Sequence, residues 1–188
     1  MTVRVALLCP YSLSRPGGVQ GQVTGLARAL SSAGHKAVVL APSERTPTDL
    51  VNFRTSEFVS LGRSVPVPAN GSVAPVALNP LSMFRAVRAL RECDADVLHL
   101  HEPLAPGPGY ACLLAGSQPK VGTFHRSGAG VAYRMFGLPA RALASRLDER
   151  CAVSPAAAAT ASAVVGGTYE VVGNGVDMER YESADPWP

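Results

Sequence analysis

The sequence has little lysine, few aromatic residues and no long hydrophobic run. No stretch approaches about 18 consecutive apolar residues, so we expect no membrane-spanning helix, and the first apolar run, at residues 5–9, is too short for a secretory signal. The only lysines are Lys36 and Lys120, and the formal net charge of +3 is too small to indicate nucleic-acid binding by itself. These absences favour a cytoplasmic protein with no nucleic-acid partner.

Two common sequence motifs are also missing. The four cysteines contain no C-x-x-C pair, so we expect them to be reduced and mostly buried. The G-x-G-x-x-G fingerprint is absent, which argues against a nicotinamide or flavin dinucleotide site and against a flavodoxin-like or dehydrogenase domain.

Apolar runs typical of buried strands alternate with segments of helical periodicity. This alternation predicts an α/β fold: a Rossmann-like, doubly wound, mostly parallel sheet with helices on both faces. The predicted strands are residues 3–9, 37–41, 58–61, 65–67, 97–101, 120–124, 152–153 and 169–172. The predicted helices are residues 19–33, 81–91, 110–115, 131–136, 140–150 and a last one that begins at Pro155, with Ser154 as its cap.

Gly17 and Gly18 lie between the first predicted strand and the first predicted helix. A glycine pair at such a junction lets backbone N–H groups approach an anion closely, and the helix N-terminus adds unpaired donors and the positive end of its dipole. The pair therefore predicts a site for a phosphate-bearing ligand. The alternative is a plain strand-to-helix turn, where glycine is common.

Histidines occur at the carboxyl ends of two consecutive predicted strands. Ligands of open parallel sheets bind outside these ends, so we expect His101, Glu102 and His125 to face one crevice with Gly18. His125 is the candidate functional residue, and His99 is expected to be a hydrogen-bonded core histidine. A metal site of His99, His101 and His125 is an alternative, but His99 and His101 would lie about 7 Å apart along a strand, an awkward spacing for joint ligation. We therefore expect no metal.

Arg85, Arg88 and Arg91 recur at helical spacing and share a broad face of one predicted helix. Such a face is either solvated or part of a basic surface that contacts anionic lipid. Both interpretations stay open on the spacing alone.

Several short motifs follow one another along nearly the whole chain. They are residues 10–12 (PYS), 16–20 (PGGVQ), 70–74 (NGSVA), 96–103 (DVLHLHEP), 123–125 (TFH), 152–154 (AVS) and 174–177 (NGVD). As an ordered set they resemble the N-terminal domain of retaining glycosyltransferases of the GT-B type. They are most similar to the actinobacterial phosphatidylinositol mannosyltransferases, which transfer mannose from GDP-mannose to the inositol of phosphatidylinositol.

The resemblance implies a domain organisation and a location. In that family two Rossmann-like domains face each other across a cleft; the N-terminal one binds the acceptor and the C-terminal one most of the nucleotide sugar. Residues 1–172 would be the acceptor-binding domain and residues 173–188 the start of the interdomain linker, with the C-terminal donor domain absent from this chain. The fragment alone would be inactive. The full-length protein would be peripheral at the inner face of the plasma membrane.

The resemblance also implies roles for single residues. Gly17 and Gly18 would bind the donor phosphate, and His125 would lie beside the transferred sugar and the reactive hydroxyl. Such enzymes use front-face displacement, with no cofactor besides the nucleotide sugar. The acceptor pocket would be lined by Tyr11, Asn70 and Ser72.

Three positions depart from the family pattern. Ala69 and Pro75 stand where the mannosyltransferases have a tyrosine and an arginine of the acceptor pocket, and Gly173 replaces a proline. An arginine would clamp a lipid phosphate, whereas proline has no donor. A different acceptor, such as an inositol phosphate or another glycolipid, therefore stays an alternative, as does a non-catalytic module that binds a phosphate ligand.

Overall fold

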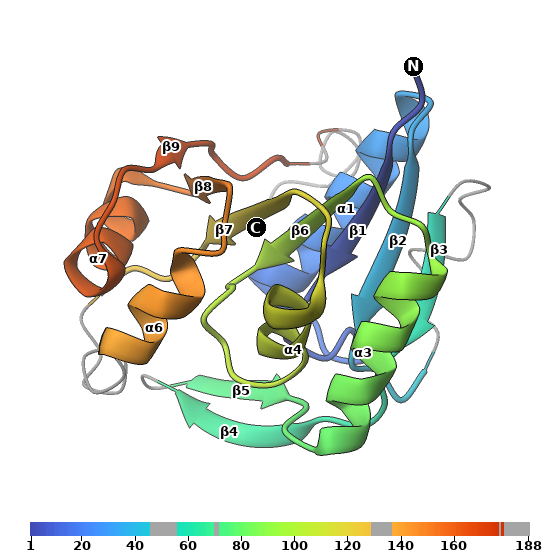
Figure 1. Cartoon of the computed structure of the whole chain (residues 1–188), viewed down its shortest axis with the longest axis horizontal. Helices are drawn as coiled ribbons and strands as arrows, with labels where there is room; N and C mark the ends of the chain where they lie inside the picture. Colours follow the sequence, from blue (N-terminus) through green and yellow to red (C-terminus); the bar gives the residue numbers. More distant parts are fainter. Residues whose placement is uncertain (46–55, 70–71, 129–136, 177, 179–188) are drawn as a thin grey trace, which may run out of the picture.

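The computed structural model describes residues 1–45, 56–69, 72–128, 137–176 and 178. In this part of the chain a sheet in the order β3-β2-β1-β6-β7-β8-β9 has only parallel neighbours, and β4 and β5 form a separate antiparallel pair (Figure 1). The strands are β1 (Arg4–Leu8), β2 (Lys36–Ala41), β3 (Ser56–Ser60), β4 (Val65–Ala69), β5 (Ser72–Val76), β6 (Val97–His101), β7 (Lys120–Phe124), β8 (Glu149–Ala152) and β9 (Glu170–Val171). The helices are α1 (Gly18–Ser32), α3 (Pro80–Glu92), α4 (Pro108–Ala115), α6 (Gly137–Ala144) and α7 (Pro155–Val165).

The side chains of β1 alternate between two hydrophobic clusters, one on each face of the sheet. Val5 and Leu7 belong to the cluster that α1 covers, whereas Ala6 and Leu8 belong to the larger cluster under α3, α4, α6 and α7. A strand that is buried on both faces has to be apolar at nearly every position, as this one is. The predicted Rossmann-like fold with helices on both faces is therefore confirmed.

The β4–β5 hairpin is attached to the end of β1, and its second strand was missed in the sequence. Tyr11 forms an isolated antiparallel bridge with Val76, and the Ser12 N–H donates to the Pro75 carbonyl at 2.8 Å. These contacts bring β5 beside the loop that precedes α1. Residues 70 and 71, between β4 and β5, lie outside the described residues.

The helix predicted over residues 140–150 is wrong in its second half. α6 ends at Ala144, and residues 149–152 form β8, which pairs in parallel with β7. Arg150 explains the early stop, because its guanidinium donates to the Ala144 carbonyl at the helix end and to the Gly166 carbonyl. The Asp148 carboxylate accepts from the Lys120 N–H at 2.8 Å and so fixes the start of the strand. Tertiary pairing here overrides local helix propensity. The helix predicted over residues 131–136 lies outside the described residues.

The predicted cap of the last helix is confirmed. The Ser154 hydroxyl accepts from the Ala157 N–H at 3.1 Å, and Pro155 follows at the first helical position. The four cysteines are free, as expected, and Cys9, Cys93 and Cys112 are buried.

Candidate functional site

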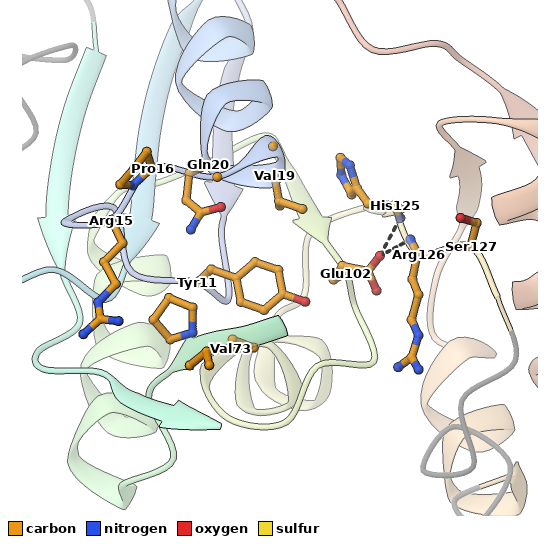
Figure 2. Close-up of a pocket in the computed structure, with 14 residues that line it drawn as sticks. Tyr11, Arg15, Pro16, Val19, Gln20, Val73, Glu102, His125, Arg126 and Ser127 are labelled. Carbon is orange, nitrogen blue, oxygen red and sulfur yellow. Dashed lines mark hydrogen bonds between the residues drawn. The ribbon is translucent and has the colours of Figure 1, made fainter. Parts of the chain in front are cut away.

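The strand order reverses between β1 and β6, and a pocket of about 440 Å³ lies at the carboxyl ends of these strands (Figure 2). Open α/β sheets bind their ligands at such a switch point. The pocket is lined by Tyr11 and residues 15–20 of the β1–α1 connection, residues 73–75 of β5, Glu102 after β6 and residues 125–127 after β7. Segments far apart in the sequence therefore form its wall.

The N-terminus of α1 faces this pocket without a cap from its own side chains. Gly17 is the N-cap in extended conformation, its carbonyl accepts the first helical bond from Gly21 N, and the first turn holds no acidic residue. The following N–H groups are therefore donors that a bound anion can satisfy. A Cβ added to Gly18 would meet no protein atom within 4 Å. The described residues therefore leave open the space that a side chain at position 18 would enter.

Three histidines stack in a row, hereafter the histidine row: His99, His101 and His125. Their ring centroids are 4.5 Å and 5.1 Å apart in sequence order. His99 Nε2 shares a 2.7 Å hydrogen bond with the hydroxyl of Thr123, as its expected core role requires, and His101 Nδ1 shares one of 2.9 Å with His125 Nε2. Only His125 lines the pocket; His101 is buried behind it. The expectation that His101 faces the crevice is therefore wrong, because the ring of His125 covers it.

Burial keeps the histidine row uncharged. It lowers the pKa of His99 and of His125 to about 4, and for His99 the neighbouring His125 adds to the effect. The pKa of His101 lies well below its ordinary value for the same reasons. At neutral pH, His125 therefore meets a ligand as a neutral imidazole that can exchange hydrogen bonds but carries no charge.

Glu102 anchors the backbone that carries His125. Its Oε1 accepts from the N–H groups of both His125 and Arg126 at 2.6 Å (Figure 2). Burial raises the pKa of Glu102, and these two bonds and Arg126 oppose the rise. Glu102 has a φ of +46°, a conformation that costs energy for a residue other than glycine. In this conformation the Glu102 carboxylate lies where it holds the end of β7 beside the pocket.

Tyr11 lies between the two walls and keeps its proton. Burial is the main cause that raises its pKa, and the nearby charge of Glu102 adds to it, whereas Arg126 lowers it. Figure 2 shows the phenol ring directed into the pocket toward Glu102. Its hydroxyl can therefore donate a hydrogen bond to a ligand at any pH near neutrality.

The structure brings together five of the residues that were predicted to lie at the site: Tyr11, Gly17, Gly18, Glu102 and His125. Ser72 begins β5 next to the lining residue Val73, and Asn70 lies outside the described residues. The arginines of α3 are exposed and do not line the pocket.

Sequence reasoning missed Arg15 and Arg126, whereas the family resemblance had already placed Pro75 of the β5 wall in the acceptor pocket. Arg126 carried a usable signal, because it directly follows His125 at the same strand end. The described residues contain no group of histidine, cysteine or carboxylate side chains that could hold a metal ion.

Comparison with known proteins identifies the family. Residues 16–180 match the profile of Glycosyltransferase Family 4. The chain belongs to this family. It is 38% identical over 95% of its length to a phosphatidyl-myo-inositol mannosyltransferase of Propionibacterium freudenreichii, and 37% identical over 97% to the protein of that name in Mycobacterium tuberculosis. It is also 31% identical over 95% of its length to a GDP-mannose-dependent alpha-mannosyltransferase of M. tuberculosis.

These curated relatives are about twice as long as the part they share with this chain, which covers 48%, 47% and 49% of their lengths. Among solved structures, Anabaena Alr3699/HepE in complex with UDP-glucose matches 95% of the chain with a TM-score of 0.64 at 16% identity, over 46% of its own length. Acinetobacter baumannii MurG matches 98% with a TM-score of 0.56 at 17% identity, over 50% of its own length. These likenesses establish the fold, which is the N-terminal half of the GT-B type.

Proposed function

We propose that this chain is the acceptor-binding domain of a retaining mannosyltransferase that transfers mannose from GDP-mannose to phosphatidylinositol. One observation carries the proposal. The uncapped start of α1, with an open space beside Gly18, and the neutral imidazole of His125 line the same pocket. A sugar diphosphate needs this combination, since the phosphates take N–H donors and the sugar hydroxyls take a neutral hydrogen-bonding partner. The names of the relatives support mannose as the sugar.

The chemistry follows from what each wall offers. The N–H groups at the start of α1 and the helix dipole stabilise the charge that grows on the donor diphosphate as the glycosidic bond breaks. His125 holds a hydroxyl of the sugar, with its Nε2 fixed by His101. The Tyr11 hydroxyl binds the acceptor, together with Asn70 and Ser72. No cofactor besides the nucleotide sugar enters this scheme.

A second domain completes the cleft in this proposal. Residues 1–172 form the acceptor domain and residues 173–188 begin the linker. The start of that segment is held against α1, because the Gln22 side chain donates to the Gly175 carbonyl at 2.8 Å and accepts from its N–H at 3.2 Å. The donor half supplies most of the nucleotide-sugar site, so the chain alone is inactive. The chain joined to a donor half, from its own gene or by fusion from the P. freudenreichii relative, is called the two-domain protein below.

Replacing His125 with alanine in the two-domain protein should lower kcat for mannosyl transfer by about 100-fold or more, because the sugar loses a positioned partner next to the reacting bond. The measurement is transfer of labelled mannose from GDP-mannose to phosphatidylinositol. A panel of other nucleotide sugars, inositol phosphate and other glycolipids tests the donor and the acceptor at the same time.

The matched control is His35→Ala, which removes the histidine outside the row. It should keep kcat near the wild-type value. A two-domain protein that transfers no sugar to any acceptor would leave the non-catalytic binding module as the function, and a fully active His125→Ala variant would remove His125 from the site.

We also propose that α3 contacts an anionic membrane surface at the inner face of the plasma membrane. Leu81 and Phe84 are 55% and 64% exposed, and they share the helix surface with exposed arginines. Arg88 pairs with Glu92 at 2.7 Å, so it contributes less charge than its neighbours. None of the described helices is long and apolar enough to cross a membrane. A helix that exposes both apolar and basic side chains suits the membrane interface.

Reversing the charge of this helix should weaken lipid binding. Each cation near an anionic surface contributes about 1 kcal/mol, so replacing Arg85, Arg88 and Arg91 with glutamate should weaken binding to phosphatidylinositol-containing vesicles by about 100-fold or more. Vesicle co-sedimentation measures this, with neutral vesicles and the Arg146→Glu variant as controls. Unchanged binding would show that these arginines form only a solvated face.

A further inference from the structure

The pocket holds two cationic side chains at different places. Among the described lining residues, Arg15 is exposed in the loop before Gly17, and Arg126 is half-buried directly after His125. The one carboxylate of this lining, Glu102, has its Oε1 occupied by two backbone N–H groups. With the start of α1 added, the pocket is positively charged overall and suits anionic ligands.

Consecutive residues at a strand end point in opposite directions, and this separates His125 from Arg126. The alternation along β6 and β7 puts the histidine row on the face of the sheet that α1 covers. Figure 2 shows the two side chains leaving the chain on opposite sides, with the Arg126 guanidinium directed away from α1. Arg126 is therefore not part of the donor set at the helix start.

Arg126 lies close enough to the acceptor side to act there. It lowers the pKa of Tyr11 and that of Glu102, so its charge is felt in the centre of the pocket. The β5 wall at residues 73–75 has only valine, alanine and proline side chains, which offer neither charge nor hydrogen-bond donors. Any cationic contact on this side of the pocket has to come from another segment, which is the loop with Arg15 or the end of β7 with the half-buried Arg126.

Two anions in one pocket repel each other and need separate sets of donors. If the donor diphosphate takes the start of α1, a phosphate on the acceptor cannot share these N–H groups. We propose that Arg126 forms a second anion subsite, which binds the phosphate of a polyol phosphate acceptor and selects such acceptors over uncharged polyols. The inference rests on the function proposed above. A guanidinium suits this role because it can donate two parallel hydrogen bonds to one phosphate. The backbone N–H of Arg126 donates to Glu102, and this bond fixes the position from which the side chain extends.

The test compares Arg126→Ala and Arg126→Lys in the two-domain protein. Arg126→Ala should raise KM for phosphatidylinositol by about 10- to 100-fold, with kcat and the KM for GDP-mannose nearly unchanged, because only an acceptor contact is lost. Arg126→Lys should give a KM for phosphatidylinositol between those of the wild type and Arg126→Ala, since lysine keeps the charge but cannot donate two parallel hydrogen bonds to the phosphate. Soluble inositol 1-phosphate is used as a second acceptor. Its comparison with phosphatidylinositol shows whether the subsite recognises the phosphate of a lipid headgroup or that of a free ester. Arg146→Ala, an exposed arginine outside the pocket, is the matched control.

Direct binding separates this inference from the proposed function. The chemical shifts of the 188-residue chain are followed while inositol 1-phosphate, and then uncharged inositol, is added. Binding of the phosphate that is lost in Arg126→Ala supports the subsite even if no mannosyl transfer is found. An unchanged affinity for inositol 1-phosphate in this variant, or a raised KM for GDP-mannose instead of the acceptor, would overturn it.

Discussion

Replacing Gly18 with valine should abolish mannosyl transfer by the two-domain protein and leave the fold intact. The added Cβ would meet no protein atom within 4 Å, so the chain itself has room for a side chain. The same side chain would stand where the donor phosphate has to reach the N–H groups at the start of α1. Losing these charge-assisted bonds should lower kcat/KM for GDP-mannose by at least about 100-fold. Steady-state kinetics measures the loss, and thermal unfolding confirms the fold.

Gly25→Ala is the matched control, because Gly25 lies in the same helix and also has no atom within 4 Å of an added Cβ. It does not line the pocket. Alanine in place of glycine inside a helix should stabilise the chain by about 0.5–1 kcal/mol and leave the kinetics unchanged. Near-normal kcat/KM in Gly18→Val would mean that the start of α1 does not bind the donor, and the site would have to be placed elsewhere.

The Rossmann-like class of the sheet and the edge on which the site lies were accessible from the sequence. Parallel strands that are buried on both faces have to be apolar runs, and their carboxyl ends share one edge, so Gly18 and His125 could be assigned to one crevice. β5 was not accessible, because a short strand with Pro75 in its middle has weak strand propensity. The end of α6 was missed for another reason. The guanidinium of Arg150 donates to the Ala144 carbonyl at the helix end, and no local pattern predicts this contact between residues six positions apart.

The contacts that fix the site geometry are long-range and leave no periodic signal. Glu102 reaches the backbone of residues 125 and 126 across a gap of more than twenty positions. Gln22 and Gly175 are 153 positions apart. Sequence patterns identify strands and helices, whereas these side chain–backbone bonds depend on how close two loops come once the sheet is assembled. The direction of Arg126 follows from the strand alternation only after the bounds of β7 are known.

Lowering the pH from 7 to 5 should destabilise the chain because of the histidine row. A histidine whose pKa is near 6.5 when unfolded and about 4 when folded binds more protons in the unfolded state between these values. Its contribution to stability is therefore complete above pH 6.5 and is lost as the pH falls toward 4. For His99 the loss between pH 7 and pH 5 is about 2 kcal/mol. Denaturant unfolding at a series of pH values measures it.

The variant that isolates this effect is His99→Gln, whose amide can still bond the Thr123 hydroxyl but takes up no proton. Its stability should fall less between pH 7 and pH 5 than that of the wild type, by about 2 kcal/mol. Glu102 acts with the opposite sign, because its raised pKa makes the folded state hold a proton at higher pH, whereas Glu44, with a pKa lowered to about 2, costs stability only at lower pH. Equal slopes in the wild type and His99→Gln would show that burial does not lower the pKa of His99 in the folded chain.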